Sequence, residues 1–70
     1  MTKATHTQIS EILDDNPWVP VHVSKSSEHD AFDGDIIDTT IIEGVVHYDV
    51  ESHDKSIFEI VALENITLAD

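Results

Sequence analysis

The sequence predicts a small, mostly β domain of the α+β class, in which one short N-terminal helix precedes four to five antiparallel strands. Apolar runs rich in β-branched and aromatic residues, which suit a pleated sheet, cover 36–42, 45–50 and 57–63. Apolar and polar residues alternate in two further segments, 18–24 and 66–68. Five short strands in succession indicate a curled antiparallel meander or a small, partly closed barrel of the SH3 or OB kind.

The N-terminal part predicts the helix. Thr5 is a suitable N-cap, and Gln8 stands three residues later as its reciprocal partner. Pro17 stops the helix, because the residue before a proline avoids the helical conformation. Residues 1–5 are expected to be frayed. An apolar stripe at helical spacing, expected to cover the sheet rather than to bind a partner, consists of Ile9, Ile12 and Leu13.

Two features of the next segment bear on function. Trp18 is the only tryptophan. We expect it to close one end of the core; the alternative is an exposed binding anchor, a role in which tryptophan is enriched. Residues 24–35 form the longest polar stretch and are predicted to be a loop, the natural place for recognition.

The register of the last hairpin follows from its apolar pattern. Placing Tyr48 opposite Ile60 makes one face of the hairpin almost wholly apolar, whereas a slip of one residue turns every side chain over. This register sets Asp49 opposite Glu59 on the other face. Ile57 and Val61 lie on that same face, which is therefore not wholly polar.

The junction at Glu43-Gly44 has two interpretations, which the sequence leaves open. A tight two-residue turn would pair Thr39 with Tyr48 and set Asp38 opposite Asp49. Glu is a poor choice for the first position of such a turn, where φ must be positive. The alternative is one long strand that bends at Gly44.

Charge is the strongest compositional feature. The 70 residues contain 15 acidic side chains, three lysines and no arginine, for a net charge of −12. This balance argues against direct binding of nucleic acid or of an anionic membrane and favours basic partners. No apolar run approaches the length of a membrane span, and the start of the chain has no signal-peptide core. A cytoplasmic protein is expected, in the host cytoplasm if a phage encodes it.

The sequence predicts neither an enzyme nor a cofactor. Its five histidines stand beside no nucleophile-elbow motif, and two glycines cannot make a phosphate-binding loop. There is no cysteine for a thiolate metal site. No metal site is predicted, and the only weak candidate, from the hairpin register, is His47, Asp49 and Glu59.

The composition and the register together predict a non-enzymatic interaction module of one domain, residues 1–70. It would bind a basic protein, as an inhibitor from a phage or mobile element whose carboxylates stand in for nucleic-acid phosphates would do. The alternative is a homo-oligomeric accessory module, such as a homodimer, whose acidity serves solubility. The predicted partner-binding residues lie on the outer face and are Asp38, Asp49, Glu51, Glu59, Ile57 and Val61.

Overall fold

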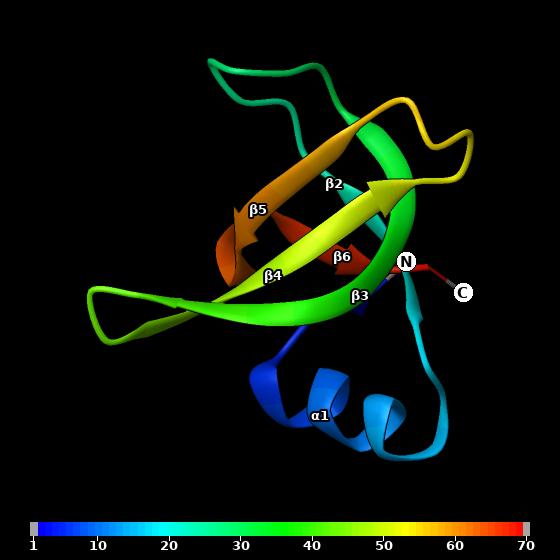
Figure 1. Cartoon of the computed structure of the whole chain (residues 1–70), viewed down its shortest axis with the longest axis vertical. Helices are drawn as coiled ribbons and strands as arrows, with labels where there is room; N and C mark the ends of the chain where they lie inside the picture. Colours follow the sequence, from blue (N-terminus) through cyan, green and yellow to red (C-terminus); the bar gives the residue numbers. More distant parts are fainter. Residues whose placement is uncertain (1, 70) are drawn as a thin grey trace.

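The computed structural model describes residues 2–69, which form one short helix and one curled antiparallel sheet (Figure 1). The elements in chain order are β1 (Thr2–Lys3), α1 (His6–Asp15), β2 (Val19–Val23), β3 (Phe32–Ile42), β4 (Val45–Ser52), β5 (Phe58–Ala62), the 3₁₀ helix η1 (Leu63–Asn65) and β6 (Ile66–Leu68).

The sheet has the strand order β1-β6-β2-β3-β4-β5. Strands β2 to β5 form a meander, β6 returns to lie beside β2, and the two-residue β1 adds to the outer side of β6. The predicted fold class is confirmed. Within residues 2–69 no pairing joins β1 to β5, so the sheet is curled but not closed into a barrel.

The concave side of the sheet holds the core. Its fully buried side chains come mainly from alternate positions of the strands, and they are Val19, Val21, Val23, Ile36, Val50 and Ile66. Helix α1 lies across one end of the curled sheet (Figure 1) and adds Ile9, which is also fully buried. Burial of one such isoleucine stabilises the fold by about 1.5–3 kcal/mol.

The ends of α1 agree with the sequence prediction. Thr5 Oγ1 accepts a hydrogen bond from the Gln8 amide at 3.2 Å, and Gln8 Oε1 accepts one from the Thr5 amide at 3.1 Å. The helix ends at Asp15, directly before Asn16-Pro17. No helix in the described part of the chain is long and apolar enough to cross a membrane.

Two predicted boundaries near the N-terminal half were wrong. Residues 1–5 were expected to be frayed; Met1 lies outside the described residues, but Lys3 pairs with β6 and Ala4 is buried. The polar loop is shorter than predicted, because β3 begins at Phe32, where it pairs with Val23.

Strand β3 is long and strongly bent, and two local features allow this. A Cβ atom at Gly34 would lie 2.4 Å from the carbonyl oxygen of Glu51, so only glycine permits this approach to β4. A β-bulge shifts the register between Ile36 and Asp38. The bulge therefore leaves Ile37 without a directly opposed residue on β4.

The structure decides between the two interpretations of Glu43-Gly44 in favour of the tight turn. Glu43 has φ 52° and Gly44 has φ 80°, the left-handed region that a primed two-residue turn requires. Thr39 lies opposite Tyr48, and Asp38 lies opposite Asp49, as that interpretation predicted. Beyond the bulge the pairing differs, since Val50 faces Ile36 rather than Ile37.

Glu43 occupies a left-handed backbone conformation that is strained for glutamate, so a substitution there can stabilise the turn. Asn tolerates positive φ better than Glu, so Glu43→Asn should raise the free energy of unfolding by about 0.5–1 kcal/mol. Chemical denaturation measures this change. Glu43→Gln is the matched control, because it removes the same charge without relieving the backbone. Equal gains in both variants would assign the effect to charge and contradict strain at this turn.

Candidate functional site

The register between β4 and β5 determines which side chains the outer, convex face of the sheet presents. Asp49 lies opposite Ile60, Tyr48 opposite Val61, and Glu51 opposite Phe58. The predicted register, with Tyr48 opposite Ile60, was therefore wrong by one residue. The slip turns all of β5 over relative to the prediction.

The loop between these strands explains the slip. It contains four residues, 53–56, whereas the prediction assumed five. Ser52 closes it, because its amide donates to the Ile57 carbonyl at 2.9 Å and its Oγ accepts from the Ile57 amide at 3.0 Å. Lys55 takes the left-handed conformation, with φ 66°, and its amide donates to the Ser52 carbonyl at 2.9 Å.

The carboxylate of Asp54 stabilises the conformation of this loop. Its Oδ1 accepts hydrogen bonds from the Ser52 hydroxyl at 2.7 Å and from the Ser56 hydroxyl and amide at 2.6 and 3.0 Å. The bonds with Ser56, then that with Ser52, lower the pKa of Asp54 from 3.8 to about 2. The sequence segment Ser52-His53-Asp54-Lys55-Ser56 thus carried the information that sets the register.

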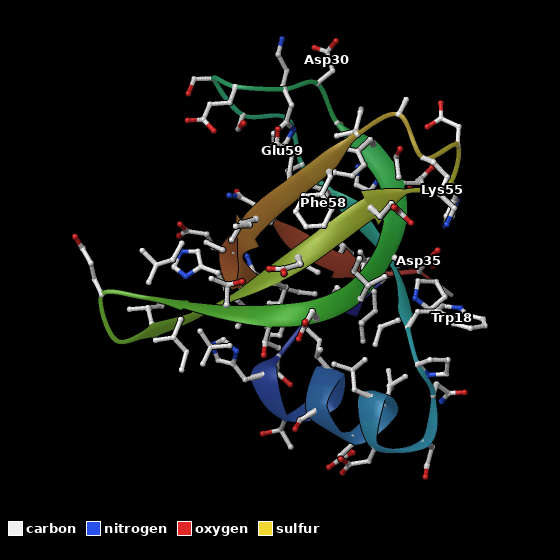
Figure 2. All side chains as sticks on the ribbon, in the orientation of Figure 1. Trp18, Asp30, Asp35, Lys55, Phe58 and Glu59 are labelled. Carbon is white, nitrogen blue, oxygen red and sulfur yellow. The ribbon has the colours of Figure 1, made fainter. Side chains whose placement is uncertain are left out.

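The side chains of β5 face the opposite side of the sheet from the one predicted. Three of the predicted partner-binding residues therefore do not lie on the outer face. Val61 is 4% exposed and belongs to the core. Glu59 lies opposite the buried Val50, so it is on the concave side and half-buried. Ile57 is also half-buried, beside Ser52. Phe58 (Figure 2) and Ile60, which the predicted register placed on the apolar face of the hairpin, are instead exposed, at 54% and 45%.

The remaining predicted acids, Asp38, Asp49 and Glu51, lie on the outer face together with Asp35, which was not among the predicted residues. Asp38 and Asp49 form one cross-strand pair, and Asp35 and Glu51 form another. Asp35 and Asp38 are three residues apart and would face opposite sides of a regular strand. The bulge at Ile37 restores both to the same side.

Trp18 also belongs to this surface. It precedes the buried Val19 and is 52% exposed, so the prediction that it closes the core was wrong. It lies near Ile37, which is 43% exposed. We call this surface the outer face; its members are Trp18, Asp35, Ile37, Asp38, Asp49, Glu51, Phe58 and Ile60.

Two acids of the outer face, Glu51 and Asp35, have a basic side chain nearby. Lys55 Nζ donates to Glu51 Oε1 at 2.7 Å, and this contact raises the pKa of Lys55. His53 Nε2 lies 3.5 Å from Asp35 Oδ1. No ion pair among the described residues involves Asp38 or Asp49.

Asp38 and Asp49 instead take hydrogen bonds from neutral donors. Asp38 accepts from the Thr39 amide at 2.8 Å, and Asp49 accepts from the Thr40 hydroxyl at 2.6 Å. Like charges on directly opposed residues destabilise a sheet. A cation supplied by a partner would relieve this repulsion.

The observed register separates the residues of the weak metal candidate, His47, Asp49 and Glu59. Glu59 faces the opposite side of the sheet from Asp49, because Asp49 pairs with Ile60. The ring of His47 is turned to its own strand, with Nδ1 at 3.0 Å from the Val45 carbonyl oxygen. Among residues 2–69 no group of three His, Asp or Glu side chains converges to hold a metal ion.

Comparison with known proteins finds no matching family model, no similar curated protein and no similar solved structure. No relative therefore supplies a function for this chain.

The hydrogen bonds of Asp54 predict a pH dependence of stability. The pKa of Asp54 is lower in the folded state than in the unfolded state, so ionised Asp54 stabilises the fold above about pH 4. This contribution to the free energy of unfolding is lost as pH falls toward 2. Asp54→Asn removes the titrating group, so the difference in unfolding free energy from wild type should shrink over that interval. Denaturant titrations between pH 2 and 6 measure it.

Asp30→Asn is the control for loss of one negative charge, because Asp30 lies in a different loop, between β2 and β3. If the wild type exceeds Asp54→Asn in free energy of unfolding by the same amount from about pH 6 to 2, the role assigned to Asp54 is contradicted.

Proposed function

We propose that this chain is a protein-interaction module whose outer face binds a basic surface of another protein. The observation that carries this proposal is the combination of exposed apolar side chains with carboxylates on one uncovered side of the sheet. Phe58 and Ile60 stand directly opposite Glu51 and Asp49, respectively. Apolar contacts with a charged surround are the anatomy of a protein interface.

The two kinds of side chain have different tasks. Burial of Trp18, Phe58 and Ile60 would add apolar contacts to an interaction that depends mainly on charge, because aromatic residues are favoured anchors in interfaces. The carboxylates would speed association and select a basic partner. The repulsion between Asp38 and Asp49 adds to this selection, since it falls when a partner brings a lysine or arginine between them.

The net charge of −12 indicates the class of partner. Proteins that bind nucleic acid expose clustered lysine and arginine, so their binding surfaces are complementary to this face. An inhibitor that occupies such a surface, encoded by a phage or mobile element and acting in the host cytoplasm, fits this chemistry.

A second candidate is self-association, which one observation favours. Strand β5 is an edge of the sheet and carries the exposed Phe58 and Ile60. Two copies would bring together two bodies of the same strong negative charge. Salt would therefore strengthen self-association by screening repulsion, whereas it would weaken binding to a basic partner.

Charge reversal on the outer face tests the proposed function. Immobilised protein should retain basic proteins from a lysate at low salt and release them at high salt, where the Debye length falls to about 3 Å. Asp38→Lys combined with Asp49→Lys should abolish most of this retention.

Glu11→Lys combined with Asp14→Lys is the matched control, because it makes the same change in net charge on the exposed side of α1. Equal loss in both double variants would show that only overall charge matters. Retention of the same proteins at 1 M salt, or association that salt strengthens, would contradict the proposal. Sedimentation of the purified protein at low salt and at 1 M salt shows whether salt strengthens its association.

A further inference from the structure

We infer that the outer face contains a pocket for a guanidinium group, formed by the indole of Trp18 and the carboxylates of Asp35 and Glu51. This inference rests on the proposed function and makes it more specific. It assigns to the basic partner an arginine, rather than a lysine, at this point of contact.

The pocket is a hollow of about 310 Å³ beside the start of β2, and the residues that line it are Trp18, Asp35, Ile37, Glu51 and Lys55. Asp35 and Glu51 are directly opposed on β3 and β4, so their carboxylates project from the same side of the sheet. Figure 2 shows Trp18 and Asp35 on the same flank of the molecule, with Lys55 further along it. An indole and two carboxylates are the groups that a guanidinium recognises best.

Lys55 lines the pocket and contacts one of its two carboxylates. It comes from the left-handed position of the loop, and its ammonium reaches Glu51 at 2.7 Å. Its pKa is raised by the hydrogen bond and charge of Glu51 and, less strongly, by the charge of Asp35. The side chain is nevertheless 72% exposed, and such surface pairs contribute little stability, so a partner's cation displaces it at small cost.

An arginine would satisfy this pocket better than Lys55 does. The planar guanidinium stacks on an aromatic face while it donates hydrogen bonds to carboxylates, whereas an ammonium acts as a compact point charge. The sequence contains no arginine, so the chain cannot fill the pocket this way itself. His53, at 3.5 Å from Asp35, is the other internal group that an arginine would displace.

The single tryptophan provides a direct readout of this pocket. Oligo-arginine and oligo-lysine peptides of equal length and charge are titrated at low salt, with Trp18 emission and calorimetry as readouts. The arginine peptide should bind about two- to fivefold more tightly and should change Trp18 emission. Lys55→Met should increase the affinity for the arginine peptide.

Pocket variants and one control separate recognition from charge. Trp18→Leu and Asp35→Asn should each remove the preference for arginine, measured by calorimetry. Asp38→Asn, on the outer face but outside the pocket, should weaken both peptides equally and keep the preference.

The outcomes distinguish the pocket from the wider proposal. Equal affinities for the two peptides, with no response of Trp18, would overturn the arginine pocket and leave the acidic interaction face in place. Failure of both peptides to bind at low salt would contradict the interaction face itself.

Discussion

The loop of four residues between β4 and β5 is the constraint on which the composition of the outer face depends. Asp54 binds both flanking serines, and the closure at Ser52 fixes where β5 begins to pair. A strand has a side-chain period of two, so this pairing turns Val61 inward and Phe58 outward. A loop one residue longer would hide the aromatic ring and expose the valine. A few polar contacts in a surface loop thus determine which apolar side chains of β5 are exposed.

The small size of the domain limits how much apolar surface it can bury. A chain of about 60–70 residues buries only ~60% of the surface of its unfolded form. Here the concave side and Ile9 of α1 form one core, whereas Ile37, Phe58 and Ile60 on the convex side are exposed. The exposed Trp18 and Phe58 are therefore a consequence of both size and topology. The bulge at Ile37 adds acids to the same surface, since it aligns Asp35 with Asp38.

Local signals in the sequence predicted the elements well. The capping residue Thr5, the break at Pro17 and the β-branched runs act over a few residues, so they determine helix ends and strands almost regardless of the rest of the fold. The register of β5 and the bulge could not be predicted in this way. The apolar pattern favoured burial of Phe58, but the closure of the loop at Ser52 outweighed it. The exposure of Trp18 agrees with the alternation along β2, because Val19, Val21 and Val23 are buried and the residue before Val19 faces the opposite side of the sheet.

Cross-strand contacts between backbone protons measure the register most directly. Antiparallel pairs without mutual hydrogen bonds bring their Hα protons close together, and pairs of this type alternate along the ladder. The closure at Ser52 and Ile57 makes Glu51 with Phe58, and Asp49 with Ile60, such pairs. We expect strong Hα–Hα nuclear Overhauser effects for both pairs in solution. Hα–Hα contacts that instead join Asp49 to Glu59 would restore the register first expected from the sequence, return Phe58 and Ile60 to the core, and contradict the outer face described above.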